Sequence, residues 1–341
     1  MAAKYRETEY VYSSARVRSL EGSIVGRERL EHMTEAKSTA EIIAMLPEYG
    51  FELVFREGSD GRDMSEIMRE ETLLSVLKKS YSDIDGMINS AHVLDFMRYQ
   101  YDCNNIKAVI KCNARGVDAA SMLIDLGTVR ADMISELIAK KDYSPFPENM
   151  AKAAEEAIEA FNKTLDPQQV DLIMDRACFA DMYDSARKSG VDYILRLVRT
   201  KIDLVNIITC IRVIRMKFGA RGADFLREAL LDGGTLEKPF FAEGYEGGEQ
   251  RLFELLGRTE YAKFADRTGA GERLSVIERV ADDTWMEVAR TAKYVPFGIP
   301  VLVGYMAALE YEVKNIRIVM AGKDAGLAPD VIRERLRASY V

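Results

Sequence analysis

The sequence feature that most constrains how this chain can fold is a short pattern that occurs three times. An Asn-Ile pair, with an acidic residue three positions before the asparagine, stands at 102–106, 203–207 and 312–316. In every copy an apolar residue lies four positions before the asparagine, and two more lie four and five positions after it. This spacing places the apolar residues along one stripe of a helix, so the pattern predicts three similar amphipathic helices.

The asparagines predict tertiary contacts. Asparagine is disfavoured inside helices because its amide competes for backbone hydrogen bonds, so a repeated helical asparagine indicates a role outside its own helix. The acid and the asparagine are three residues apart and therefore share one helix face. We expect each amide to bond the backbone or side chains of a neighbouring helix, with the acid held beside it. The six signature residues are Asp102, Asn105, Asp203, Asn206, Glu312 and Asn315.

Helix signals dominate the rest of the chain. Ser38 followed by Glu41 predicts a capping box, Asp166-Pro167 predicts a second helix start with Gly190 as its stop, and a third start is expected near Pro329. A glycine also closes each copy of the repeat, at Gly116, Gly219 and Gly322.

Strand signals are weak. The sequence has no sustained alternation of polar and apolar residues and no Asn-Gly or Asp-Gly turn between β-branched runs. The segments Asp142–Asn149 and Leu231–Gln250 are rich in Gly and Pro and are interpreted as loops. The predicted fold class is therefore all-α, with helices separated by these loops.

The repeat also predicts the organisation of the chain. We expect a single subunit of three similar helical repeats, at about 1–125, 126–235 and 236–341, with signature helices near 95–116, 193–219 and 303–322. The alternative is that the pattern arises by chance in a helix-rich chain.

Charge and cysteine usage exclude several classes of protein. The chain has 47 basic and 55 acidic residues, and this acidic excess argues against a general nucleic-acid binder. The first 30 residues lack the apolar core of a signal peptide, and the four cysteines form no Cys-x-x-Cys pair, so we expect a reducing cytoplasm. The longest apolar stretch, Ile299–Leu309, is too short to span a bilayer.

Candidate chemistry is sparse. The Gly322-Lys323 pair resembles the end of a phosphate-binding loop, but Arg317 and Asp324 occupy the positions where that loop needs Gly and Ser or Thr. We therefore interpret Gly322 as a helix cap. His32 and His92 have no zinc-site spacing with the cysteines. We predict no catalytic residue, no cofactor and no metal.

The most suggestive polar feature is a basic helix. Four arginines form two pairs at a spacing of three residues, and they are candidates for binding an acidic partner helix. The alternative is a solvated helix face. The residues are Arg196, Arg199, Arg212 and Arg215.

Five segments of the chain, taken in order, resemble the sequences of a known family. The chain resembles the C subunits of archaeal and bacterial A/V-type rotary ATPases, which are related to the d subunit of the vacuolar ATPase. The resemblance extends over essentially the whole chain. The matching segments are YVYSSARVRSLEGSIV, NNIKAVIKCNARG, LIMDRACFADMYDSARKSG, DYILRLVRTKIDLVNIITCIRVIRMKFG and LEYEVKNIRIVMAGKDAGL.

The resemblance implies a non-catalytic subunit of three helical bundles arranged as a pseudo-threefold funnel. In that family the protein sits on the cytoplasmic face of the membrane, as a peripheral protein. It links the central stalk of the ATPase head to the proteolipid ring, so its membrane association is indirect. It thereby couples ATP hydrolysis or synthesis to ion transport. Two alternatives stay open: a soluble α-helical scaffold unrelated to membranes, and a helical enzyme that binds a phosphorylated substrate through the basic helix.

Overall fold

A computed structural model of the protein describes residues 7–57, 68–88, 93–217 and 220–341. The regular elements of these residues are helices, without a β-strand, so the predicted all-α class is confirmed. The α-helices, in chain order, are α1 (Val11–Leu20), α2 (Arg27–Glu35), α3 (Thr39–Met45), α4 (Arg69–Met87), α5 (Asp95–Arg115), α6 (Ala131–Lys140), α7 (Glu148–Thr164), α8 (Pro167–Ser189), α9 (Asp192–Met216), α10 (Ala220–Ala229), α11 (Lys238–Leu256), α12 (Ala262–Arg267), α13 (Leu274–Ala289), α14 (Ile299–Asp324) and α15 (Pro329–Arg333). The 3₁₀ turns are η1 (Glu7–Tyr10), η2 (Glu21–Ser23), η3 (Leu46–Tyr49), η5 (Ala120–Met122) and η6 (Arg290–Tyr294).

The chain folds into two compact units. The described residues 93–272 form one, which we call the central unit. The described residues before 89, together with Arg273–Val341, form the other, which we call the terminal unit. Each of the two units therefore has its own helix packing.

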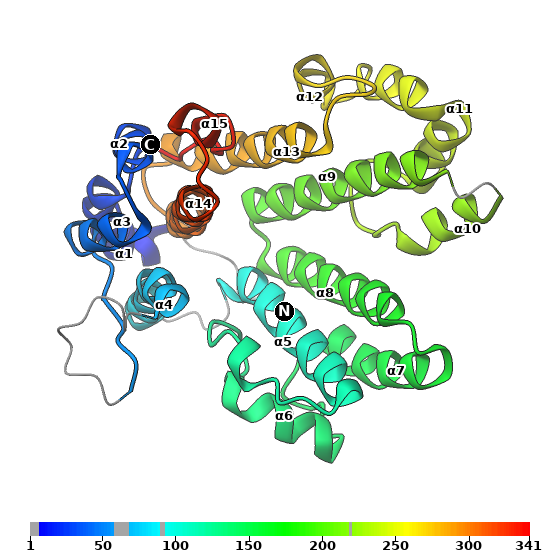
Figure 1. The fold of residues 1–341 in the computed structure, drawn as a ribbon, viewed down its shortest axis with the longest axis horizontal. Coiled ribbons are helices and arrows are strands. Elements are labelled where there is room, and N and C mark those ends of the chain that lie inside the picture. Colours follow the sequence, from blue (N-terminus) through cyan, green and yellow to red (C-terminus); the bar gives the residue numbers. More distant parts are fainter. Residues whose placement is uncertain (1–6, 58–67, 89–92, 218–219) are drawn as a thin grey trace. The chain divides into compact units, whose positions relative to one another are not determined.

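The central unit is organised around α8, which contacts α5, α7 and α9. Helix α7 lies against α8 with a face of small buried residues, Ala153, Ala154 and Ala157. Small side chains let two helix axes approach closely. Helix α6 packs on α5, and α9 contacts both α10 and α11. Successive helices of this unit therefore lie beside one another (Figure 1).

The terminal unit is built around α14. The residues Ile299–Leu309, which form its first half, are all buried. A helix that is apolar on every side must be surrounded, and α14 contacts α1, α2, α3, α4, α13 and α15. Within the described residues, no helix has both the length and the apolar character needed to cross a membrane.

Two predicted helix starts are confirmed. The Ser38 hydroxyl accepts a hydrogen bond from the Glu41 N–H at the start of α3. The Asp166 carboxylate accepts one from the Gln168 N–H, and Pro167 begins α8. The predicted stop of α8 is also present, because Gly190 adopts the left-handed conformation with φ of 66°.

The third predicted start and the glycine stops give a mixed result. Pro329 begins α15, which extends only to Arg333. Gly116 ends α5 in the left-handed conformation with φ of 64°. The predicted stop at Gly219 lies outside the described residues.

The predicted loop at Leu231–Gln250 is wrong in its second half, which is helical. Helix α11 begins at Lys238, with Pro239 in its first turn where a missing N–H costs nothing. Burial of the Phe241 side chain anchors this turn. Gly248 breaks the helical geometry with φ of 78° and ψ of −178°, so α11 bends there instead of ending. Tertiary packing overrides the low helix propensity of this glycine-rich segment.

The prediction of Gly322 as a helix cap is also wrong. Helix α14 continues to Asp324, and Gly322 is a buried helical residue. A Cβ atom at Gly322 would lie 2.7 Å from Cγ1 of Ile332 on α15. The glycine therefore allows close packing between two helices.

Candidate functional site

The three signature asparagines make the same pair of hydrogen bonds. Each amide donates to a carbonyl oxygen of the chain that follows its helix, and each amide oxygen accepts the N–H of that same residue. The partners are Ile124 for Asn105 (2.8 and 2.8 Å), Leu231 for Asn206 (3.0 and 2.8 Å) and Arg337 for Asn315 (3.2 and 2.8 Å). All three asparagines are buried. The bonds go to the backbone of a following segment, whereas we expected a neighbouring helix.

The acids of the first two copies bind the same segment a few residues further on. Asp102 accepts hydrogen bonds from the N–H and hydroxyl of Thr128 and from the Val129 N–H, just before α6. Asp203 accepts the corresponding bonds from Thr235 and from the Leu236 N–H, before α11. Burial raises the pKa of Asp102, and its hydrogen bonds offset part of that effect. Each acid and asparagine together fix the chain that leaves the signature helix.

Glu312, the acid of the third copy, has a different partner. It accepts a hydrogen bond from the Val25 N–H, in the segment before α2. Its Oε2 atom is buried and has no hydrogen-bond partner among the described residues. Burial raises the pKa of Glu312 to about 8, because the Val25 bond and the charge of Arg29 offset only part of the cost of burying a carboxylate.

The residue that precedes the bonded threonine explains this difference. A Cβ atom at Gly127 would lie 2.0 Å from Oδ1 of Asp102, and one at Gly234 would lie 2.1 Å from Oδ1 of Asp203. Each glycine lies three positions after the residue to which the signature asparagine is hydrogen-bonded, Ile124 or Leu231. In the third copy that position is Tyr340, a fully buried aromatic residue. The segment Ile24–Gly26 therefore supplies the N–H group for Glu312 from the other end of the chain.

Two further buried carboxylates were missed by the sequence analysis. Asp181 on α8 accepts the Asn149 and Met150 N–H groups (3.0 and 2.8 Å) at the start of α7. Asp283 on α13 accepts the Ala338 N–H at 2.7 Å. Asp181 lies between Cys178 and Met182 on the apolar stripe of α8. An acidic residue at a position where the helical spacing predicts an apolar one is the sequence signal that could have identified Asp181.

The four candidate arginines of α9 do not form one surface. Arg196 and Arg212 are both exposed, but at ~100° per residue their positions differ by about 160° around the helix axis. Each lies with its neighbour, Arg199 or Arg215, on a different side of α9. A single partner helix cannot contact all four through one face of α9.

Arg199 and Arg215 make defined contacts within the central unit. The Arg199 guanidinium lies over the Tyr183 ring, 5.9 Å from its centroid. Arg215 donates to both carboxylate oxygens of Glu249 on α11 (3.0 and 2.5 Å) and to the Glu272 carbonyl. Burial alone would raise the pKa of Glu249, but the hydrogen bonds from Arg215 and the Gly271 N–H hold it below its usual range. Arg215 thus ties α9 to α11.

Metal-ligand geometry is absent from the described residues, in which no group of three or more His, Cys, Asp or Glu side chains could hold an ion. The four cysteines are free and buried. His32 is exposed, and His92 lies outside the described residues.

Comparison with known proteins gives a family match over nearly the whole chain. The model of the family described as "ATP synthase (C/AC39) subunit" matches residues 13–335.

Individual relatives align over similar lengths. The chain is 24% identical to the C subunit of the A-type ATP synthase of Thermococcus kodakarensis, over 97% of this chain and 91% of that protein. It is 21% identical to the C subunit of the V-type sodium ATPase of Enterococcus hirae, over 97% of this chain and 99% of that protein. It is 27% identical to the C subunit of the A-type ATP synthase of Haloferax volcanii, over 95% of this chain and 96% of that protein.

Proposed function

The chain belongs to the ATP synthase (C/AC39) subunit family, and from this premise we propose that it is a non-catalytic coupling subunit of a rotary ATPase. In this role it links the central stalk of the soluble head to the proteolipid ring of the membrane sector. The family match over residues 13–335 carries the proposal, because relatives named as the C subunits of A-type and V-type enzymes align along almost their full lengths.

The buried contacts of the signature helices support a mechanical role. A part that transmits torque must resist shear, and closely packed helices with few voids do so. In this chain, buried polar side chains fix the exits of α5, α9 and α14 by pairs of hydrogen bonds. Such bonds hold each following segment in one position relative to its helix.

We propose that the three signature helices belong to three bundles arranged as a pseudo-threefold funnel. Helices α5 and α9 would anchor the first two bundles, and α14 the third. The described residues before 89 pack around α14, so we assign them to the third bundle. Similar surfaces of the three bundles would contact identical subunits of the ring, and several weak contacts together would give a stable attachment.

For the stalk, the basic helix α9 offers two candidate contacts. Arg196 and Arg212 are the exposed members of the four arginines. We propose that an acidic segment of the stalk contacts one side of α9, and that separate substitutions will show which side. The protein would lie at the cytoplasmic face of the membrane, held there through the ring.

Purification of the native protein tests the proposed function. The protein should copurify with membranes and with an ATPase head, and a wash that strips peripheral proteins should release it. In cells that lack it, the head should still hydrolyse ATP while ATP-driven ion transport is lost. Isolation as a free monomer with catalytic turnover of its own would contradict the proposal and favour the alternative of a helical enzyme.

A further inference from the structure

The terminal unit contains an arginine-lined hollow of about 900 Å³. The start of α13, the end of α14 and the segment 327–337 line it, together with Arg27. Six lining side chains are arginines, and Glu334 is the single acid among the lining residues. In a chain of net charge −8, this lining concentrates positive charge. The arginines are Arg27, Arg273, Arg279, Arg333, Arg335 and Arg337.

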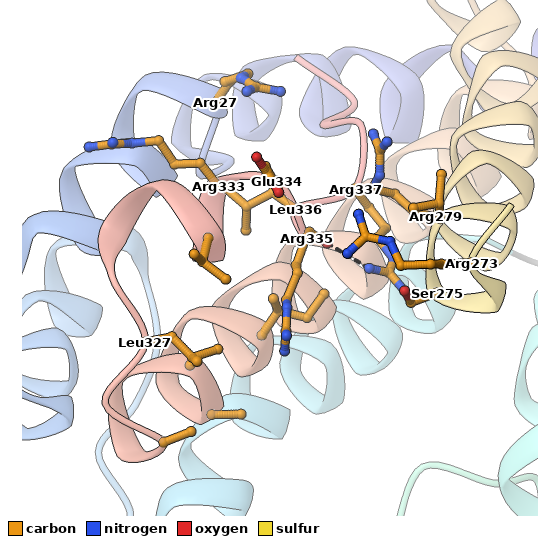
Figure 2. A pocket seen from close by; sticks show the side chains of 16 residues that line it. Arg27, Arg273, Ser275, Arg279, Leu327, Arg333, Glu334, Arg335, Leu336 and Arg337 are labelled. Atoms are coloured by element: carbon orange, nitrogen blue, oxygen red, sulfur yellow. Dashed lines mark hydrogen bonds between the residues drawn. The ribbon is translucent and has the colours of Figure 1, made fainter. Parts of the chain in front are cut away.

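The arginines approach the hollow from several sides. Figure 2 shows Arg273, Arg279 and Arg337 gathered on the side of α13, with Arg333 pointing away from them. In this view, Arg335 lies between these three residues and Arg333. The Arg337 guanidinium also donates to the Arg335 carbonyl at 2.6 Å, which holds this part of the C-terminal segment in place.

Acids near the hollow pair with several of these arginines. Arg27 pairs with Glu31 at 2.7 Å, and Arg333 pairs with both Glu35 and Asp330. Asp282 is shared, because it accepts hydrogen bonds from both Lys314 (2.6 Å) and Arg337 (2.9 Å). Asp283 already accepts the Ala338 N–H, and its other oxygen lies 3.9 Å from Arg279. Among the described residues, the exposed Arg335 guanidinium makes neither a hydrogen bond nor an ion pair.

The remaining lining is largely apolar. It is formed mainly by Ile318 and Ala321 on α14 and by Ala325, Leu327 and Val331 after it. The hollow thus combines cationic side chains with an apolar wall. Its volume falls within the range of ~300–1,000 Å³ that is typical of small-molecule pockets.

We propose that this arginine hollow binds a soluble organic phosphate, with two or more phosphate groups on an apolar or planar body. All six cationic lining residues are arginine, whose planar fork binds phosphate oxygens in pairs. The apolar wall on α14 contacts the organic body. This inference goes beyond the proposed coupling function and does not rest on it, because the purified chain alone should bind the ligand.

The experiment is calorimetric titration of the full-length chain, at low salt with a chelator, using ATP, tripolyphosphate and adenosine as probes. ATP should bind most tightly, tripolyphosphate more weakly, and adenosine most weakly. Because a charge-assisted hydrogen bond to phosphate is lost, Arg335→Gln should weaken ATP binding about tenfold. Circular dichroism and thermal melts verify that each variant is folded.

Arg317→Gln provides the matched control. Arg317 is also an exposed arginine of the terminal unit, but it binds Glu70 and does not line the hollow. This variant should bind ATP with an affinity within about twofold of the unsubstituted chain, a change of under ~0.5 kcal/mol. Equal losses in Arg317→Gln and Arg335→Gln would reveal non-specific charge attraction and overturn the proposal. The proposal would also be overturned by an absence of saturable ATP binding or by equal affinities for ATP and tripolyphosphate. Displacement of ATP by an equimolar oligoglutamate peptide would overturn it as well, and would identify an acidic protein segment as the occupant.

Discussion

At the scale of single residues, buried polar side chains determine how the signature helices connect to the rest of the fold. Asn105, Asn206 and Asn315 each satisfy both polar groups of one backbone residue. A buried backbone group without a partner is costly, so these side chains are required wherever the chain passes the helix without pairing with another backbone segment.

Replacement of one signature asparagine tests this role. Asn105→Ala leaves the N–H and carbonyl of Ile124 without their partners, and we expect a loss of about 2–4 kcal/mol in the free energy of unfolding. The adjacent Asn104 is exposed on the same helix, so Asn104→Ala is a matched control that should change stability by under ~0.5 kcal/mol. Urea denaturation measures both, and similar values for the two variants would contradict the assignment.

Glu312 should make stability depend on pH. Its folded-state pKa of about 8 lies above the ordinary value of 4.5, so the folded state retains a proton that the unfolded state releases between these two values. Stability should therefore fall as the pH rises from about 5 to 8 and then level off. In Glu312→Gln this loss should disappear, so the variant should gain stability relative to the parent chain as the pH rises. Urea midpoints at pH 5.5 and 8.5 measure the effect.

The control for this pH dependence is Glu136→Gln. Glu136 is exposed on α6 and paired with Lys140, so its substitution should leave the pH profile of the parent chain unchanged. A Glu312→Gln variant whose urea midpoint fell with pH as steeply as that of the parent would assign the dependence to other groups.

At the scale of elements, glycines decide where helices bend and how closely they pack. The segment that contains α11 has the composition of a loop, yet it forms a helix with a bend at Gly248. The φ of 78° and ψ of −178° at Gly248 fall in a region that only glycine adopts without strain. Gly322 instead brings α14 close to Ile332.

Glycine substitutions in two helices should have opposite effects. Gly248→Ala forces a Cβ atom into a strained backbone conformation and should cost about 1–3 kcal/mol. In α4, Gly86 has a helical backbone, and no atom lies within 4 Å of the position that a Cβ atom would occupy. Gly86→Ala should therefore raise stability by about 0.5–1 kcal/mol. Thermal denaturation distinguishes the two, and stabilisation by Gly248→Ala would refute the bend.

At the scale of the whole molecule, the two ends of the chain complete one folded unit. The terminal unit contains α1–α4 from the beginning of the sequence and α13–α15 from its end. The Val25 N–H bonds Glu312, and the last residues of the chain bind Asn315 and Asp283. Ser339 and Tyr340 are buried, although chain termini are usually exposed.

Removal of the C-terminal residues should therefore destabilise the terminal unit. Deletion of residues 337–341 leaves both groups of the Asn315 amide, and Oδ1 of Asp283, without the partners described here. We expect a fall of several degrees in the melting temperature, whereas deletion of Val341 alone should have a smaller effect. Equal melting temperatures for the two truncated chains would show that this segment does not stabilise the fold.

Charge reversal on α9 tests the proposed assembly at the same scale. Arg196→Glu and Arg212→Glu change exposed residues on different sides of the helix, so one of them should weaken binding of the head's stalk while the other does not. Copurification at physiological salt measures this. Retention of binding in the double variant would exclude α9 as the stalk contact.

The sequence by itself determined the helical class, several helix ends and the three signature positions. These features depend on local spacing: capping residues act within one turn, and the Asn-Ile pattern repeats on one helix face. It also determined the family, because the similarity extends over nearly the whole chain.

Only the tertiary structure decided which groups the signature residues bind. The partners of Asn105, Asn206 and Asn315 depend on where the chain returns after each helix, and the partner of Glu312 comes from the opposite end of the sequence. The helix at α11 and the role of Gly322 likewise depend on packing against distant residues. Such contacts leave no periodic pattern in the sequence, because the separation between partners is set by the lengths of the intervening segments and by the packing of the helices between them.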